Sequence, residues 1–409
     1  MTRSHQNNPA GMTKKYAFVK IRTNHTVVRQ ISNILKHSFP GYREEIIDIK
    51  PLLKRRPHLI LINIFHILRI YGPDSFTSGK NILYIRFFGT PFMFHQIRKL
   101  LQGRISAGGY AFTFQDNSLF DASTPGTPNF VYTDHTLLEN RCYPDFDASR
   151  DLLCNEWMAL EKEIYHNAAL VLTRYGKIVD SVVNDYACDR SKVRNIYYAP
   201  YDDPDPGTQN DAKYATRNIL FVGIEWKRKG GPVLLEAFRQ VLSRVPDASL
   251  TIVGCMPECD LPNVEIVGKI GKEQLTQHYE NASVFCLPTL KEHAGIVFTE
   301  AMRYRLPVVG TRIGAIPEYI EPGENGYLVD AGDAGQLAEV LCKLVADQER
   351  CRRFGQSSYR KYCDNFTLEV VSGKIRESLT PFISGGDRKK ADNAGDATAT
   401  LPSHSSETA

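Results

Sequence analysis

Glu292 and Glu300 are separated by seven residues, at a point where the sequence changes from strand to helix and back to strand. The apolar runs at 284–288 and 307–311 indicate two short buried strands, and 296–304 indicates a helix between them. Strand, loop, helix and strand form the crossover unit of a parallel sheet. We therefore expect Glu292 in a loop at the carboxyl end of a strand, where such sheets bind ligands, and Glu300 about one turn into the helix.

The residues between the two glutamates favour binding of an anion. Gly295 allows a ligand to approach the backbone closely, and the free amides of Ala294, Gly295 and Ile296 at the helix start can hold a phosphate. With a carboxylate on either side, the site suits a ligand with hydroxyls at both ends and phosphate in the middle, such as a nucleotide sugar. The alternative is an ordinary helix start with both glutamates solvated.

The sequence of residues 292–302, Glu-His-Ala-Gly-Ile-Val-Phe-Thr-Glu-Ala-Met, is followed by Pro-Val-Val at 307–309. It resembles the paired-glutamate signature of the retaining nucleotide-sugar glycosyltransferases of the GT-B fold, in particular glycosyltransferase family four. Ala294 stands where an aromatic residue is common, and 303–305 is bulkier than the usual turn. The resemblance implies that Glu300 binds ribose hydroxyls, that Glu292 binds hydroxyls of the donor sugar, and that residues 294–296 hold the diphosphate.

A basic loop lies within the segment 221–238, Phe-Val-Gly-Ile-Glu-Trp-Lys-Arg-Lys-Gly-Gly-Pro-Val-Leu-Leu-Glu-Ala-Phe. This segment resembles the phosphate-binding segment of the same family, and the resemblance implies that Lys229 neutralises the leaving diphosphate. The family's arginine is replaced by Ile224, so Lys227 or Arg228 is the candidate for the missing cation. The alternative is a surface basic loop. A strand and turn are expected at 264–270. By the same resemblance, the last three residues of this segment lie against the nucleobase: Gly268, Lys269 and Ile270.

His135 is one of the polar residues that end an expected strand at 129–136, within Tyr-Thr-Asp-His-Thr. The resemblance implies that it faces the transferred sugar, and the neighbouring Asp134 is expected to fix its tautomer. A lone histidine more often has a structural role, so both interpretations stay open. Arg174, at the end of an expected strand, either lies near the cleft between the domains or forms a structural ion pair.

Strands and helices alternate along most of the chain, which predicts an α/β protein with parallel sheets. The expected architecture is GT-B: two Rossmann-like doubly wound domains facing across a cleft, with a C-terminal helix that crosses back. In the first domain, 59–70 is expected to be a helix and 81–88 a strand. The expected divisions are a disordered N-terminus, an acceptor domain, a donor domain, a crossing helix and a flexible tail, at residues 1–13, 14–205, 206–366, 367–383 and 384–409.

Composition places limits on the partners. Fifty Lys and Arg against 46 Asp and Glu give a net charge of +4, too weak to indicate a nucleic-acid partner, and no nucleic-acid motif is present. No run approaches the roughly 20 apolar residues of a spanning helix, and the nine scattered cysteines indicate reduced thiols, so a cytoplasmic location is expected. A basic cluster at Lys50, Lys54, Arg55 and Arg56 leaves open either peripheral contact with the membrane's cytoplasmic face or a solvated basic surface.

The expected activity is transfer of a sugar from a nucleotide diphosphate sugar to a hydroxyl of a glycan, lipid-linked or small-molecule acceptor, with retention of configuration. No metal and no other cofactor are expected, because fixed cations and helix ends can carry the charge. Two alternatives remain. One is a nucleotide-sugar epimerase of GT-B architecture, which turns over donor without acceptor. The other is a non-catalytic sugar-binding or nucleotide-sugar-binding protein.

Overall fold

The computed structural model describes residues 14–21, 25–77, 79–143, 146–200, 210–292 and 294–383. The expected disordered N-terminus, the expected tail at 384–409 and most of the proline-rich segment between the two expected domains lie outside these residues. Among the described residues, no helix is long and apolar enough to cross a membrane. All nine cysteines are free thiols, as their spacing predicted.

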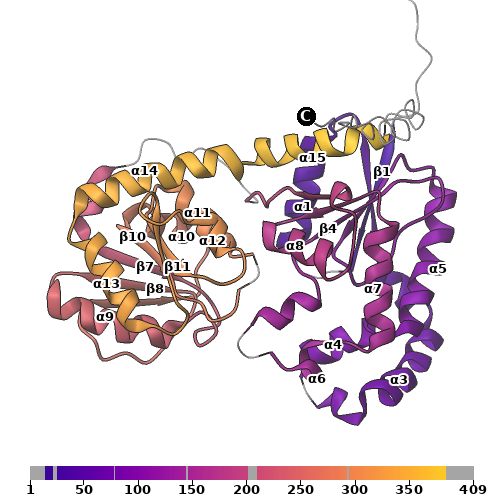
Figure 1. The fold of residues 1–409 in the computed structure, drawn as a ribbon, viewed down its shortest axis with the longest axis horizontal. Coiled ribbons are helices and arrows are strands. Elements are labelled where there is room, and N and C mark those ends of the chain that lie inside the picture. Colours follow the sequence, from indigo (N-terminus) through magenta and orange to yellow (C-terminus); the bar gives the residue numbers. More distant parts are fainter. Residues whose placement is uncertain are drawn as a thin grey trace, which may run out of the picture.

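The first half of the chain builds a six-stranded parallel sheet in the order β2-β1-β3-β4-β5-β6 (Figure 1). Strands β3, β4 and β5 are buried along their whole length, as the central strands of a parallel sheet with both faces covered are. Phe18 and Val19 contribute to different hydrophobic clusters, as neighbouring residues of a two-sided strand do. The strands are β1 Lys15–Lys20, β2 Arg43–Asp48, β3 Thr113–Asp116, β4 Asn129–Thr133, β5 Leu170–Thr173 and β6 Val193–Asn195.

The helices of this half cover the sheet and add a helical region between β2 and β3. They are α1 His25–Ser38, α2 Ile49–Lys54, α3 Pro57–Tyr71, α4 Lys80–Phe88, α5 Pro91–Gly108, α6 Ala148–Asp151, α7 Asn155–Asn167 and α8 Gly176–Asn184, with short 3-10 turns η1 Pro73–Phe76, η2 Leu138–Cys142 and η3 Arg190–Lys192. The prediction of a strand at 81–88 is wrong, because this segment is α4. Phe88 is its single buried residue, so its long apolar run covers the side of α3 instead of entering a sheet.

The second half builds another six-stranded parallel sheet, in the order β12-β11-β10-β7-β8-β9. Its strands are β7 Asn218–Val222, β8 Ser249–Val253, β9 Val264–Gly268, β10 Val284–Leu287, β11 Val308–Thr311 and β12 Gly326–Val329. The strand order reverses direction at the β7–β10 pair, which is where ligands bind in sheets of this type. The other elements are η4 Asp211–Thr216, α9 Gly231–Arg244, α10 Lys272–Asn281, α11 Ile296–Arg303, α12 Ile316–Tyr319, α13 Ala334–Val345 and α14 Gln348–Asn365.

The last helix, α15 Leu368–Ile383, runs from the second half back onto the first, along the top of Figure 1. It packs beside α1, where the Ser38 hydroxyl donates to the main-chain carbonyl of Ser372 at 3.1 Å. Val371, Ile375 and Leu379 are fully buried in the core of the first half. The expected crossing helix is therefore confirmed.

Candidate active site

Lys229 and Glu292 form an ion pair at the switch point of the second sheet. Lys229 ends the loop that follows β7, and Glu292 lies in the loop that follows the neighbouring strand β10. Glu292 is 8 % exposed, so its carboxylate depends on Lys229 for charge compensation. The structure thus joins the two charged residues that the sequence had indicated separately, 63 positions apart.

Glu292 leads directly into the start of α11, where Gly295 has φ +60°. A Cβ at this position would lie 3.3 Å from both Phe298 and Tyr319, so glycine is favoured by conformation and by space. The Tyr319 hydroxyl donates to the main-chain carbonyl of Ala294 and fixes the turn. Ile296, the first helical residue, is half-buried and packs against the core of the first half.

Arg228 holds the two loops of the pair together. Its guanidinium donates to the main-chain carbonyl of Lys291 at 2.7 Å and to both carboxylate oxygens of Glu225, at 2.8 and 3.0 Å. Lys227 is exposed, and Ile224, in place of the expected arginine, is 69 % exposed. Arg228 therefore braces the segment on which Glu292 stands.

Glu300 lies on α11 one turn beyond the helix start and is half-buried. Burial raises the pKa of its carboxyl, and a 3.0 Å hydrogen bond from the Tyr279 hydroxyl offsets part of this shift. Tyr279 is itself fixed by stacking on Tyr304, with ring centroids 5.5 Å apart. The Tyr279 hydroxyl therefore fixes the position of the Glu300 carboxylate.

The candidate nucleobase residues lie at the end of β9. Gly268 has φ +72°, and a Cβ there would lie 2.7 Å from the sulfur of Met256. The carbonyl of Gly268 accepts a 2.6 Å hydrogen bond from the amide of Gly254, which joins this turn to the end of β8. Lys269 is exposed and Ile270 half-buried, so both side chains are accessible at the edge of the sheet.

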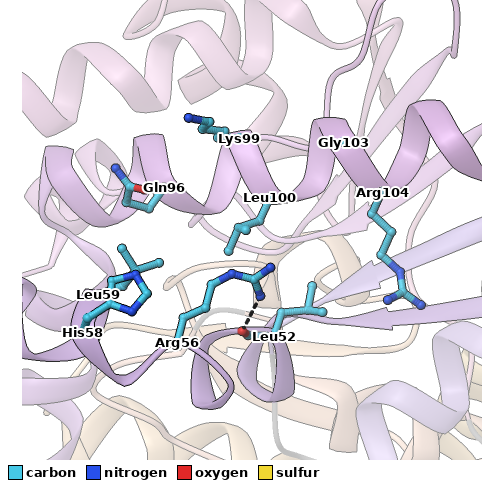
Figure 2. A pocket seen from close by; sticks show the side chains of 9 residues that line it. All are labelled: Leu52, Arg56, His58, Leu59, Gln96, Lys99, Leu100, Gly103 and Arg104. Atoms are coloured by element: carbon cyan, nitrogen blue, oxygen red, sulfur yellow. Dashed lines mark hydrogen bonds between the residues drawn. The ribbon is translucent and has the colours of Figure 1, made fainter.

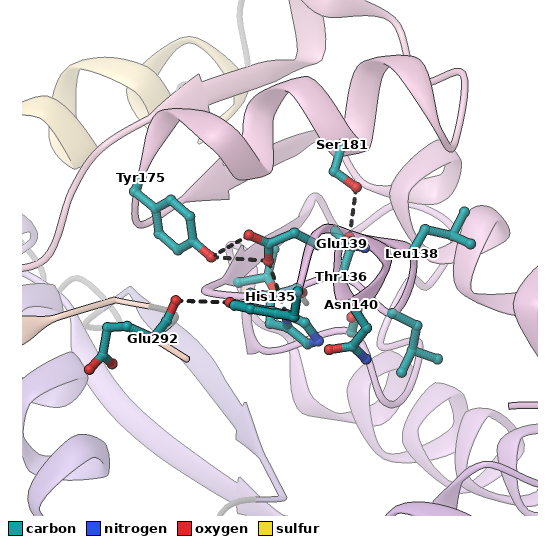
Figure 3. Close-up of polar contacts among 12 residues, drawn as sticks. His135, Thr136, Leu138, Glu139, Asn140, Tyr175, Ser181 and Glu292 are labelled. Atoms are coloured by element: carbon teal, nitrogen blue, oxygen red, sulfur yellow. Dashed lines mark hydrogen bonds and ion pairs between the residues drawn. The ribbon is translucent and has the colours of Figure 1, made fainter. Parts of the chain in front are cut away.

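His135 lies just beyond β4, in the first half. Its Nδ1 is 3.0 Å from a carboxylate oxygen of Glu139, which also accepts from the Tyr175 hydroxyl at 2.9 and 3.0 Å (Figure 3). The prediction that Asp134 fixes this ring is wrong: the carboxylate on Nδ1 belongs to Glu139, four residues further along the chain. Glu139 is buried and His135 is partly exposed, so the orienting group lies behind the ring.

Asp134 instead pairs with Arg174, at 3.0 Å, and Arg174 also pairs with Asp116 at 3.0 Å. The guanidinium lies over the rings of Tyr132 and Tyr198 as well. Arg174 is only 2 % exposed. Of the two interpretations of this residue, the geometry therefore supports the structural ion pair. This network supports the carboxyl ends of β3, β4 and β5 beneath His135.

Tyr143 connects the two halves at this point. Its hydroxyl donates a 2.8 Å hydrogen bond to the main-chain carbonyl of Glu292. The ammonium of Lys291 lies over the Tyr143 ring, 4.8 Å from the ring centroid. A second contact between the halves joins the Glu318 carboxylate to the amide of Gly176 at the start of α8, at 2.6 Å. These contacts come from segments that follow the carboxyl ends of strands in both sheets.

Sequence reasoning missed Tyr143 and Glu139. Glu139 stands four residues after His135, the spacing that brings side chains together on one helical turn, and this signal was available in the sequence. Tyr143 carried no local signal, because its partner lies 149 residues away. His293, between Glu292 and Ala294, lies outside the described residues.

Comparisons with known proteins agree with this architecture. Residues 216–347 match the family Glycosyl transferases group 1. The chain is 27 % identical over 297 residues to D-inositol 3-phosphate glycosyltransferase of Corynebacterium jeikeium (strain K411), covering 64 % of this chain and 70 % of that protein.

Two solved structures share the fold. Sucrose-phosphate synthase from Thermosynechococcus elongatus superposes with TM-score 0.65 at 16 % identity, over 91 % of this chain and all of that chain. Alr3699/HepE of Anabaena, in complex with UDP and glucose, superposes with TM-score 0.60 at 13 % identity, over 90 % of this chain and 99 % of that chain. The expected GT-B fold is confirmed.

The chain therefore carries a group 1 glycosyltransferase domain within a GT-B fold. It is an enzyme of the glycosyltransferase class, as the motif at residues 292–302 predicted.

Proposed function

We propose that this protein transfers a sugar from a nucleotide diphosphate sugar to an acceptor hydroxyl with retention of anomeric configuration and without a metal ion. The observation that carries the proposal is the ion pair of Lys229 and Glu292 at the start of α11, beside the loop that carries His135. An ammonium, a helix N-terminus and a carboxylate there present complementary groups to a diphosphate and to the hydroxyls of a sugar.

The ion pair suggests how the donor enters. Lys229 compensates the charge of the nearly buried Glu292. A diphosphate that takes over the ammonium, together with the amides of residues 294–296, frees the carboxylate to accept hydrogen bonds from hydroxyls of the sugar. As the sugar–phosphate bond breaks, negative charge grows on the leaving diphosphate, and the fixed cation and helix end stabilise that charge without a metal.

Glu300 and the turn at Gly268 complete the donor site in this proposal. The Glu300 carboxylate, already held by Tyr279, accepts hydrogen bonds from the ribose hydroxyls. Gly268 allows the nucleobase to approach the backbone at the end of β9, with Lys269 and Ile270 beside it. The separation of these groups along the sheet edge suits a ligand with a base and ribose at one end and a sugar at the other.

His135 contacts the transferred sugar from the first half, and Glu139 acts on the reaction only by orienting that ring. The acceptor hydroxyl attacks from the side that the diphosphate leaves, and a phosphate oxygen takes the proton. The relative from Corynebacterium jeikeium is named for an inositol phosphate acceptor, and the Anabaena protein was crystallised with UDP and glucose. We therefore propose a UDP sugar as the first donor to test and a glycan or lipid-linked molecule as the acceptor, with the protein in the cytoplasm.

The first experiment is a thermal-shift screen against UDP, GDP, ADP and TDP sugars, since a ligand that binds only the folded state raises the melting temperature. Transfer is then measured with the stabilising donor for wild type, Lys229→Ala and the matched control Lys343→Ala, which removes an exposed lysine of α13 in the same half. We expect Lys229→Ala to lower kcat by about a hundredfold or more and the control to retain activity.

Three results would contradict the proposal. They are near-normal transfer by Lys229→Ala, turnover of the donor without acceptor to give an epimer, and loss of activity in a metal chelator that added metal restores. Product anomers resolved by NMR test retention directly.

A further inference from the structure

The helical region between β2 and β3 concentrates positive charge. Residues 49–108 contain ten Lys and Arg and one acidic residue, Asp74, which gives this region a net charge of +9. The whole chain carries +4, so the remaining residues together carry −5. This region contains α2 to α5, of which α3 and α5 lie on the side of the first half away from the second sheet (Figure 1).

The same region exposes large apolar side chains on one face of α3. Leu61 and Phe65 are 68 % and 63 % exposed, and Ile62 and Leu68 are also exposed. The spacing 61, 62, 65 and 68 places these four residues on one side of the helix, and we call them the α3 face. The opposite side is anchored by the fully buried Asn63, which donates to the main-chain carbonyl of Phe87 at 2.8 Å.

Neighbouring elements extend the α3 face. Phe76 of η1 and Ile85 of α4, both on elements that pack against α3, are exposed at 43 % and 41 %. Among the described residues, 11 large hydrophobic side chains are exposed, and six of them lie in this one region. A soluble surface scatters such residues singly, so their concentration here indicates a binding surface.

A basic cavity of about 560 Å³ lies between α3 and α5, next to the α3 face. His58, on the same side of α3 as Ile62 and Phe65, forms part of its wall. Its other charged or polar walls include Arg56, Lys99 and Arg104, and Leu52 and Leu100 contribute apolar surface (Figure 2). Arg56 is held in place by the main-chain carbonyl of Leu52 at 3.1 Å.

We propose that the α3 face and the basic cavity together form a docking surface for a bilayer of anionic phospholipid. The apolar side chains enter the boundary between headgroups and acyl chains, and the cavity binds a headgroup phosphate. A lipid surface presents apolar matter and negative charge side by side over the whole width of this region. A symmetric dimer through this surface would bring two regions of +9 together, and a nucleic acid would leave the α3 face exposed.

The test measures binding of the full chain to vesicles in a flotation assay, and it does not depend on the proposed function. We expect binding to phosphatidylcholine vesicles that contain phosphatidylglycerol, little binding to phosphatidylcholine alone, and loss of binding at high salt. Lys54→Gln with Lys99→Gln removes two exposed lysines, each expected to lower affinity about fivefold. Leu61→Ser with Phe65→Ser is expected to lower affinity at least about tenfold.

Matched controls come from the second half. Met256→Ser removes an equally exposed apolar side chain, and Lys343→Gln with Arg353→Gln removes two exposed cations. Both controls should bind vesicles as wild type does. The proposal is overturned if anionic vesicles do not bind, if control and test variants lose affinity equally, if inorganic phosphate alone raises the melting temperature without any vesicle binding, or if Leu61→Ser with Phe65→Ser dissociates a dimer and leaves vesicle binding unchanged.

Discussion

The hydroxyl of Tyr143 donates a 2.8 Å hydrogen bond to the main-chain carbonyl of Glu292, so a residue of the first half holds the loop that carries the central carboxylate of the second. The side chain of Glu292 meanwhile points to Lys229. The backbone of Glu292 therefore depends on how the halves dock, whereas its carboxylate depends on the second sheet alone. A change at the contact between the halves can alter the active site without touching any charged group in it.

Tyr143→Phe is expected to lower kcat/KM by about tenfold, because small displacements of a positioned group are costly in catalysis. Loss of the hydrogen bond should also cost about 1 kcal/mol of stability. The matched control is Tyr214→Phe, which removes a 2.7 Å hydrogen bond to the main-chain carbonyl of Arg305 within the second half. Steady-state kinetics and thermal unfolding of both variants check this. Equal losses of kcat/KM in the two would show that Tyr143 has only a structural role.

Glu139→Gln is expected to lower kcat by on the order of tenfold to a hundredfold, because the carboxylate that orients His135 becomes an amide of the same size. The double variant with His135→Ala should be no slower than His135→Ala alone, since both changes act through one ring. Tyr175→Phe is the control, because it removes the other partner of Glu139 and leaves the contact with His135 intact. Additive losses in the double variant would mean that Glu139 does not act through His135.

Glu300→Gln is expected to raise the KM for the donor by about tenfold, the effect of weakening hydrogen bonds to a charged group. Its kcat should change less, because the ribose lies away from the reacting bond. Tyr279→Phe removes the hydroxyl that contacts the carboxylate but keeps the carboxylate, so its effect on KM should be smaller. A donor titration under initial-rate conditions checks both values. An unchanged KM in Glu300→Gln would remove this residue from the donor site.

Glu318 should make stability depend on pH. Burial raises the pKa of its carboxyl above the ordinary 4.5, with the amides of Gly176 and Lys177 partly offsetting the shift. The folded protein therefore keeps this proton to higher pH than the unfolded chain does, and this carboxyl lowers the free energy of unfolding as pH rises from about 4.5 through the folded pKa. Glu318→Gln, which does not titrate, should gain stability relative to wild type over this window.

Glu318→Ala separates the hydrogen bonds from the charge. It removes the acceptor at the start of α8 and, relative to Glu318→Gln, which does not titrate either, should cost about 1 kcal/mol at every pH, as loss of a helix cap does. Melting temperatures of wild type and both variants, measured from below pH 4.5 to neutral pH, provide the comparison. A difference between wild type and Glu318→Gln that stays constant with pH would contradict the predicted linkage.

Much of the fold was readable in the sequence because strands of parallel sheets are buried on both faces. The runs at 284–288 and 307–311 were predicted as strands and contain β10 and β11, and the helix predicted between them is α11, within one residue of its predicted end. The wrong prediction of a strand at 81–88 has the same origin. An apolar run of that length fits a buried strand as well as a helix, and only its position against α3 decided for the helix.

The sequence by itself determined the residue types of the site and their positions in the local secondary structure: Glu292 before a helix start, Gly295 at the turn, and Lys229 at the end of a basic loop. The tertiary structure decided which of them meet. Lys229 and Glu292 pair because β7 and β10 are neighbours in the sheet. His135 meets Glu139 instead of Asp134 because Arg174 binds the latter, and Glu292 meets Tyr143 because the two halves dock. Local sequence sets backbone conformation, whereas contacts across tens of residues depend on the order of strands in a sheet and the packing of one half on the other.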